Sequence, residues 1–220
     1  MPFKERAPAA EYRVIDRWED GVGWIAHPDE TMQRASHAVA VDGDVWVFDP
    51  VDAPDLDDLL AELGDVKGVV VTMDRHSRDA AAVATRHHAR VHLPSFVRVS
   101  VDAPVERVGA KLGDTDFRTV KVLNWPWWQE AAFFDGETLV VGDALGNASY
   151  FTAGDERLGV HPMLRLLPPA ALRGLAPDRI LVGHGTGVLE DATPALDAAL
   201  RNARRGLPEA WLTGLREAFA

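Results

Sequence analysis

Three short polar segments follow apolar stretches that read as buried strands, and they carry the side chains best suited to chemistry. They are residues 72–79 (TMDRHSRD), 141–143 (VGD) and 183–185 (GHG). Strand ends in layered α/β folds are where sites are usually built. Carboxylates and imidazoles bind zinc, iron and manganese, and guanidinium groups pair with anions. The sequence therefore predicts a site in which residues 72–79 meet Asp143 and His184.

The elements that must position these segments begin with hairpins and continue as alternating helices and strands. Asp42-Gly43 separates two apolar stretches, and glycine removes the steric cost of the positive φ in a tight hairpin turn. Leucines at helical spacing then precede Gly64, which indicates a helix that ends there. The expected strands are residues 12–18, 23–27, 36–41, 44–49, 68–72 and 90–93, and the expected helices are residues 56–63 and 78–88.

The second half of the chain repeats this order of strands before helices. Asp135-Gly136 predicts another hairpin, and Pro194 and Pro208 suit the first turns of two late helices. The expected strands are residues 117–123, 131–134, 138–141 and 179–182, and the expected helices are residues 167–175, 194–205 and 208–219. We expect one domain over residues 1–220, with two β-rich halves and helices outside them.

Composition excludes several classes of function. The chain has 34 acidic and 23 basic residues, a net charge of −11 and no cluster of Lys and Arg, so we expect neither nucleic acid nor membrane as a partner. It has no cysteine, which leaves His, Asp and Glu as ligands for any transition metal. With no apolar leader at its start, the chain is expected in the cytoplasm, and its acidity suits a halophile. The oligomeric state stays open.

The ordered set of segments resembles the metallo-β-lactamase superfamily over residues 35–190. In that family a hairpin ends in Asp-Pro, here Asp49-Pro50, and the next strand ends in Thr-His-x-His-x-Asp-His, aligned here from Thr72. A later hairpin ends in Gly-Asp, here at Asp143, and a late strand in Gly-His-Gly, here at His184. The resemblance implies an α/β fold, the four-layer αβ/βα sandwich, with its site at the shared edge of two sheets.

The same alignment shows that most metal ligands of the family are replaced. Two ligand positions of the first metal and two of the second hold other side chains, namely Met73, Arg75, Ser77 and Arg78. The later loop that supplies one more His is replaced by residues 124–130 (NWPWWQE). Asp143 and His184 remain, one ligand short of the three that a catalytic zinc site usually keeps. A dinuclear site of the family type is therefore not expected.

The first hypothesis is a degenerate metal site without a cofactor. A buried Asp143 without metals needs another cation, and Arg75 and Arg78 occupy former ligand positions facing it in the family fold. The chain would then be a non-hydrolytic protein that binds a small, anionic ligand, because guanidinium groups favour anions. The expected pocket residues are Arg75, Arg78, His76, Asp143, His184, Trp127 and Trp128.

The alternative hypothesis is a hydrolase with one metal ion. Sliding the first motif by one residue assembles a donor set for one zinc, iron or manganese ion, namely Asp74, His76, Asp79, Asp143 and His184. Such an ion lowers the pKa of a bound water.

Simpler interpretations stand beside both hypotheses. His76 lies between two arginines and is expected at the surface or behind the site, and His87 and His88 suit the C-terminus of a helix. The tryptophans of residues 124–130 are expected either to fill the space that the metals and the lost His leave, which we favour, or to line a pocket for an apolar ligand. Glu130 is expected either to pair with an arginine or to begin a strand in solvent.

Overall fold

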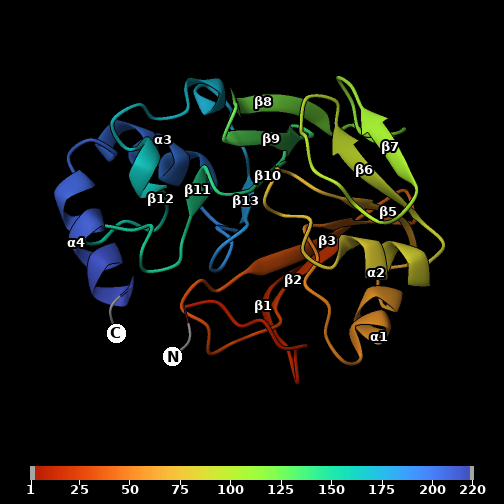
Figure 1. Ribbon diagram of the computed structural model, residues 1–220. Coiled ribbons are helices and arrows are strands. Elements are labelled where there is room, and N and C mark those ends of the chain that lie inside the picture. The colour runs from red at the N-terminus through yellow and green to blue at the C-terminus, as the bar shows by residue number, and fades with distance from the viewer. Residues whose placement is uncertain (1–2, 219–220) are drawn as a thin grey trace.

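The computed structural model describes residues 3–218, and the side chains of residues 3–213. Two β-sheets lie face to face, with helices on their outer sides (Figure 1). The larger sheet has seven strands in chain order, antiparallel from β1 to β4 and parallel from β4 to β7. Its strands are β1 (Arg13–Trp18), β2 (Gly21–Ile25), β3 (Ala35–Val41), β4 (Asp44–Phe48), β5 (Asp65–Val70), β6 (Arg90–Pro94) and β7 (Val105–Val108).

The smaller sheet has four strands in the order β13-β10-β9-β8. They are β8 (Arg118–Trp125), β9 (Trp128–Phe134), β10 (Thr138–Val141) and β13 (Arg179–Val182). Parallel pairing of β10 with β13 brings the ends of these two strands side by side. A separate two-stranded ladder joins β11 (Leu145–Gly146) and β12 (Gly159–Val160).

The helices lie outside the two sheets, which gives the four layers. On the larger sheet they are α1 (Leu56–Ala61) and α2 (Ala80–Arg86), and on the smaller sheet α3 (Ala192–Asn202), followed by α4 (Leu207–Ala218). Two short 3₁₀ helices, η1 (Pro162–Leu164) and η2 (Ala170–Leu172), precede β13.

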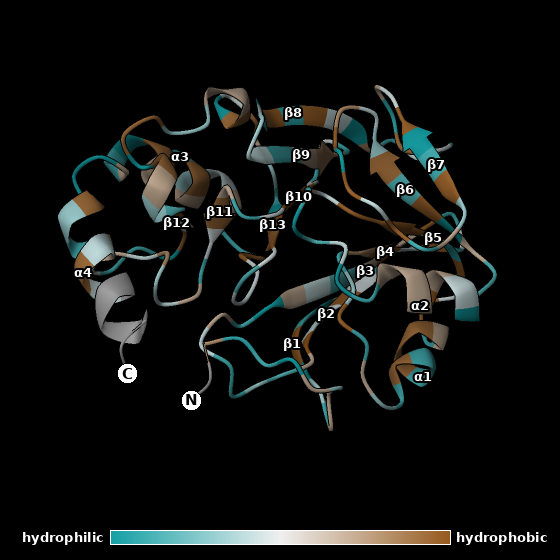
Figure 2. Ribbon diagram, in the orientation of Figure 1, coloured by the Kyte–Doolittle hydropathy of each residue, from teal (hydrophilic) through white to brown (hydrophobic). Residues whose placement is uncertain are grey.

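Three apolar clusters hold these layers together. Leu56 and Val83 pack with the outer face of the larger sheet, and Leu196 and Leu200 with that of the smaller one. Phe48, Phe117 and Phe133 lie between the sheets, with ring centroids 5.8 Å apart in two edge-on pairs. Figure 2 shows the hydrophobic residues gathered in the strands at the centre of the molecule. Burial of apolar faces on both sides of each sheet is the main source of stability.

Most of the predicted elements are confirmed, including the hairpin at Asp42-Gly43, where both residues have positive φ (53° and 89°). The predicted helix over residues 167–175 is wrong, because only the single turn η2 forms there. Residues 124–130 form the tight connection of β8 and β9 rather than a loop. The strands β7, β11 and β12 were not predicted. The expected helix end at residue 219 lies outside the described residues.

No helix within residues 3–218 is long and apolar enough to cross a membrane.

Candidate metal centre

Three side chains of ligand type converge where strands of both sheets end. His76 follows β5, Asp143 follows β10 and His184 follows β13. The Nε2 atoms of His76 and His184 lie 2.9 and 3.0 Å from Asp143 Oδ1, and the ligand atoms of the three residues all lie within 4.8 Å of one another. The residues are 4%, 8% and 1% exposed. The protein therefore holds a buried His-Asp-His group that could bind a metal ion.

Glycines let these strand ends approach one another closely. A Cβ atom at Gly183 would lie 2.7 Å from Cε1 of His76, and one at Gly142 would lie 2.8 Å from Oγ1 of Thr72. Contacts under 3.0 Å essentially do not occur for real Cβ atoms. Each of the last two ligands thus follows a glycine because any larger residue would separate the strand ends.

The Nδ1 atoms of both imidazoles, which point away from Asp143, donate hydrogen bonds. His76 Nδ1 donates to Asp49 Oδ2 (2.7 Å), and His184 Nδ1 donates to the carbonyl oxygen of Met32 (2.7 Å). Each Nε2 atom therefore presents a lone pair when the ring is neutral. This is how metal-binding histidines are usually oriented by their neighbours.

Asp143 Oδ1 is buried and makes no hydrogen bond of proper geometry among the described residues, although both Nε2 atoms lie within 3.0 Å of it. Three lone-pair atoms at such distances repel one another unless a cation lies among them. That cation is either a proton on one imidazole or a metal ion. Two imidazole nitrogens and one carboxylate oxygen are a suitable ligand set for zinc, iron or manganese, so the three residues could hold one such ion.

The pKa shifts show how the group holds its charge without a metal. Burial and Arg78 both lower the pKa of His76, but the carboxylates of Asp143 and Asp49 outweigh them and raise it. Burial lowers the pKa of His184, although Asp143 opposes it. Burial would raise the pKa of Asp143, yet His76 and the contact with His184 hold it well below its ordinary value. Without metal, His76 is the imidazole that carries the proton.

Asp49, the first residue of the Asp-Pro pair, orients His76 from behind. Its carboxylate also accepts hydrogen bonds from the N–H (2.8 Å) and Oγ1 (2.6 Å) of Thr72. Burial would raise the pKa of Asp49, but His76, Arg78 and Thr72 lower it. Sequence reasoning noticed Asp49-Pro50 only as a feature of a hairpin end and missed this role.

The two arginines predicted to face Asp143 lie in different places. Arg75 Nη2 donates to Asp143 Oδ2 (3.0 Å), and its guanidinium lies 4.4 Å from the ring of Trp128, while its side chain stays 44% exposed. Arg78 has no contact with the Asp143 carboxylate. It donates instead to the backbone carbonyls of Ala35, Asp49 and Gly183, and so fastens the ends of β3, β4 and β13 together.

The other predicted residues lie outside the cluster. Asp74 Oδ2 accepts the Gln129 N–H (3.1 Å), and Asp79 Oδ2 accepts the Asp52 N–H (2.9 Å), so the structure does not bring either carboxylate to the three ligands. Of the tryptophans, Trp128 is buried and Trp127 is 56% exposed. His76, which the simpler interpretation expected at the surface or behind the site, is buried with its ring against Asp143.

Glu130 is fully buried, so neither expectation for it, an arginine partner or a position in solvent, is correct. It accepts the Trp128 Nε1–H (2.7 Å) and the Ala144 N–H (2.9 Å), and thereby joins β9 to the turn that carries Asp143. Burial and the nearby Asp143 carboxylate raise the pKa of Glu130 to about 7. Its sequence position in an apolar strand was the only signal for this role.

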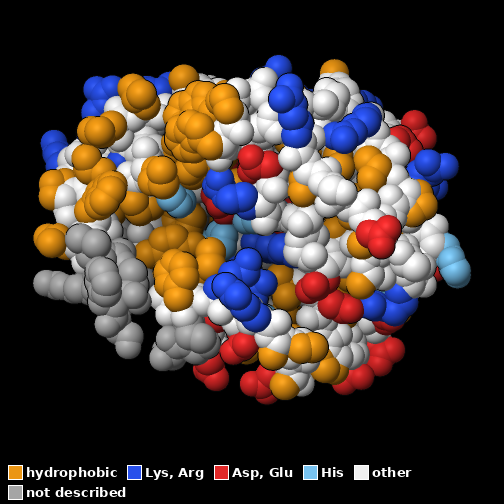
Figure 3. Space-filling view, in the orientation of Figure 1, with side chains coloured by type: hydrophobic (Ala, Val, Ile, Leu, Met, Phe, Trp, Pro, Cys, Tyr) orange, Lys and Arg blue, Asp and Glu red, His pale blue; other side chains and the backbone are white. Residues whose placement is uncertain are grey.

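His161 borders the cluster and was missed in the sequence, where nothing distinguishes it. Its ring lies edge-on to Trp128 (4.9 Å) and Phe151 (5.3 Å), and its Nδ1 accepts the Met163 N–H (3.2 Å). Burial lowers its pKa to about 4, which keeps the imidazole neutral. Figure 3 shows histidines near the centre of a hollow, with hydrophobic side chains to the left of them and Lys and Arg to the right.

The architecture matches the metallo-β-lactamase fold in solved structures. A DIM-1 metallo-β-lactamase exposed to ceftazidime has a TM-score of 0.62 and 13% identity, over 92% of this chain and 99% of that one. ETHE1 from Myxococcus xanthus has a TM-score of 0.50 and 19% identity, over 82% and 81%. The apo chemotaxis sensor ODP from T. denticola has a TM-score of 0.51 and 14% identity, over 86% and 93%.

No protein-family model and no curated protein matches the sequence. The chain thus has the metallo-β-lactamase fold, as the ordered segments predicted, while these low identities establish the fold alone.

Proposed function

We propose that this protein is a mononuclear metal-dependent hydrolase, with His76, Asp143 and His184 as the ligands of one zinc, iron or manganese ion. The observation that supports this most is the pair of Nδ1 donors, which turns both Nε2 atoms toward Asp143 Oδ1, an oxygen without a hydrogen bond of proper geometry. An ion bound there supplies Lewis-acid chemistry and lowers the pKa of a water that it binds. Three protein ligands leave a position free, as catalytic zinc sites do.

The arginines support one ion rather than two. Arg75 occupies the second oxygen of Asp143, the carboxylate that bridges two metals in the family. Arg78 stands where the family has a ligand of the second metal, and a guanidinium does not serve as that ligand. His76, Asp143 and His184 are also the one group of ligand type found in the described part of the chain.

Neighbouring side chains hold the proposed ligands and border the hollow. Asp49 and the Met32 carbonyl fix the two imidazole rings, and Arg75 fixes the carboxylate. Trp128 and the neutral His161 form an apolar border. A border of this kind excludes water and strengthens electrostatic interactions with a substrate.

A second candidate function is a metal-free protein that binds a small anionic ligand. The observation in its favour is the ion pair of Arg75 and Asp143, which, together with a proton on His76, balances the buried carboxylate without any metal. The two candidates differ in whether activity and stability depend on metal.

A reconstitution experiment separates them. Protein stripped with a chelator is loaded with zinc, manganese or iron(II) and assayed against ester, thioester, lactone and phosphodiester substrates. We expect turnover with at least one metal and loss of at least about 100-fold in His76→Gln, with His87→Gln, a histidine outside the cluster that contacts Asp57, as the control. Absence of metal-dependent turnover across this panel, or turnover that consumes dioxygen, would contradict a hydrolase.

A further inference from the structure

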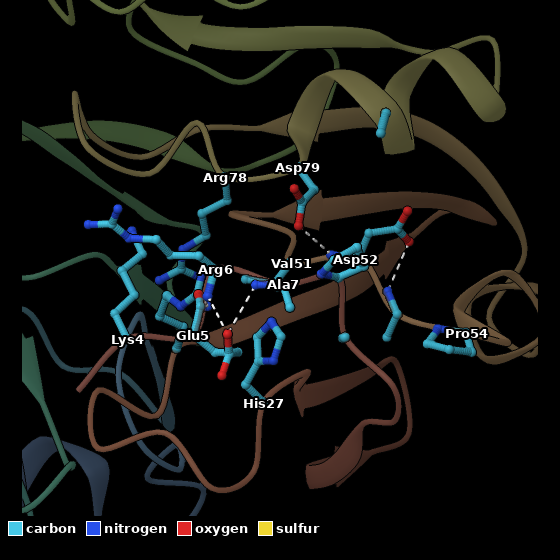
Figure 4. A pocket seen from close by; sticks show the side chains of 15 residues that line it. Lys4, Glu5, Arg6, Ala7, His27, Val51, Asp52, Pro54, Arg78 and Asp79 are labelled. Carbon is cyan, nitrogen blue, oxygen red and sulfur yellow. Dashed lines mark hydrogen bonds between the residues drawn. The ribbon is translucent and has the colours of Figure 1, made fainter. Parts of the chain in front are cut away.

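A second cavity, of about 650 Å³, lies beside the metal centre and shares Arg78 with it (Figure 4). The N-terminal segment around Lys4 and Arg6 forms one wall, and residues 51–54 after β4 form another. None of the three proposed metal ligands lines this cavity. It is therefore a separate place for a ligand, beyond the proposed hydrolytic centre.

Cations without an acidic partner gather at one end of this cavity. Lys4 and Arg6 are exposed and form no ion pair with any residue in the described range, and Arg78 bonds to backbone carbonyls rather than to a carboxylate. Arg34, in contrast, is neutralised by Glu30 through two bonds of 2.7 and 2.8 Å. Two cations without an ion pair, beside the buried guanidinium of Arg78, are unexpected in a chain with a net charge of −11.

Neighbouring arginines repel the Lys4 ammonium. Partial burial, followed by the charges of Arg34 and Arg78, lowers the pKa of Lys4, although Glu30 opposes them. An anion placed among these side chains would relieve that repulsion.

The acidic residues of the cavity do not neutralise these cations. Asp52 pairs with Arg86 through two bonds of 2.9 Å, and Asp79 accepts the Asp52 N–H. In Figure 4 Asp52 lies on the far side of the cavity from Lys4, and Asp79 lies between Arg78 and Asp52. Glu5 turns its carboxylate back to the N–H groups of its own turn (2.8 and 3.0 Å).

We propose that this cavity binds the phosphate group of a small molecule, with Lys4 and Arg6 as its direct contacts and Arg78 as a fixed charge beneath it. A phosphate monoester carries close to two negative charges at neutral pH, which suits three cations better than a single carboxylate does. The organic part would lie on the apolar side of the cavity, formed by Val51, Ala53, Pro54 and Ala82. Arg75, already paired with Asp143, has less charge to offer an anion.

The test is calorimetric titration of chelator-treated protein with phenyl phosphate and with inorganic phosphate. We expect saturable binding of one phenyl phosphate per chain, tighter than that of inorganic phosphate because of the apolar wall. Lys4→Ala with Arg6→Ala should weaken binding by about tenfold or more, and added salt should weaken it further. Both side chains are exposed, so the variant should fold. Lys67→Ala, an exposed lysine outside the cavity, should bind as the wild type does.

Two results would overturn the proposal. One is the absence of saturable binding by the metal-free protein at millimolar phosphate. The other is binding that the Lys4 and Arg6 substitutions leave unchanged, which would place the anion elsewhere. The protein is free of metal in this titration, so phosphate binding is tested independently of the hydrolase proposal. If phenyl phosphate bound only after metal was added back, the anion would be at the metal centre and not in this cavity.

Discussion

Asp49→Asn tests whether the carboxylate behind His76 keeps this ligand in place. Asp49 is 4% exposed and accepts hydrogen bonds from Thr72 and from His76 Nδ1. Its φ is 47°, in the left-handed region that Asn adopts about as readily as Asp. The substitution therefore changes charge and hydrogen bonding with little change of shape.

The size of the effect follows from the donors that surround Asp49. Both carboxylate oxygens accept hydrogen bonds, so the amide NH₂ must face at least one donor and lose that bond. A buried hydrogen bond to a charged group contributes about 1.5–3 kcal/mol. At about 2–4 °C per kcal/mol for a chain of this size, the melting temperature of the metal-free protein should fall by roughly 3–12 °C. Loss of the residue that orients a ligating histidine should also weaken metal affinity by about 10–100-fold.

Two measurements separate these effects. Differential scanning calorimetry in chelator gives the stability, and competition with a chromophoric chelator gives the metal Kd. Thr72→Val is the matched control, because it removes the Oγ1 hydrogen bond to the carboxylate, at a cost of about 1.5–3 kcal/mol, and keeps the hydrogen bond between Asp49 and His76. A variant Asp49→Asn that is destabilised but keeps the wild-type Kd would refute the assigned role of Asp49.

Three further predictions concern the charges around the cluster. Metal binding near pH 7 should release protons, because the pKa of His76 is raised and its imidazole must lose its proton to bind a metal; the release is measured calorimetrically in buffers of different ionisation enthalpy, and no release would mean that His76 is neutral beforehand. Glu130 has a pKa of about 7 when folded and 4.5 as a free side chain, so stability should fall by about 3 kcal/mol as pH rises from 4.5 to 7. In denaturant titrations at several pH values, Glu130→Gln should abolish that fall in stability. An unchanged dependence of stability on pH would show that the fall does not come from Glu130. Arg75→Ala should cost at most about 1 kcal/mol in the metal-free protein, because its side chain is 44% exposed, and should weaken metal binding because it frees the Asp143 carboxylate; an unchanged metal Kd would show that Arg75 does not hold this ligand.

The sequence predicts the strand ends that carry the site because the local signals there are strong. Asp143 and His184 follow short apolar runs and adjoin glycines, and parallel pairing of β10 with β13 brings them together as expected. The same reasoning places residues 72–79 beside them. These positions follow from the order of the strands in the fold, and the order of the motifs along the sequence predicts that order.

The direction of each side chain in residues 72–79 depends on contacts that are distant in the sequence. Met73 forms a bridge with Glu130, and the Asp74 N–H bonds to the Gln129 carbonyl, so Asp74 points away while His76 turns inward to Asp49. From their spacing in the sequence alone, Asp74 and His76 are equally suitable as metal ligands.

The partners of Arg78 also could not be predicted from the sequence, because they depend on contacts between distant strands. Its charge suggests a carboxylate partner, and the sequence therefore predicts contact with Asp143. In the structure, carbonyl groups at three strand ends surround the guanidinium and satisfy it instead. Which acceptors a buried arginine finds is decided by how strands from both sheets meet, and no local pattern records that.

The most direct test of the account is the metal content of protein purified without chelator, measured by elemental analysis beside His76→Gln and His87→Gln. We predict about one zinc, iron or manganese ion per chain in the wild type and in His87→Gln, and almost none in His76→Gln. A wild-type protein that stays metal-free even after incubation with these ions, or one that holds two ions per chain, would contradict a mononuclear centre at His76, Asp143 and His184.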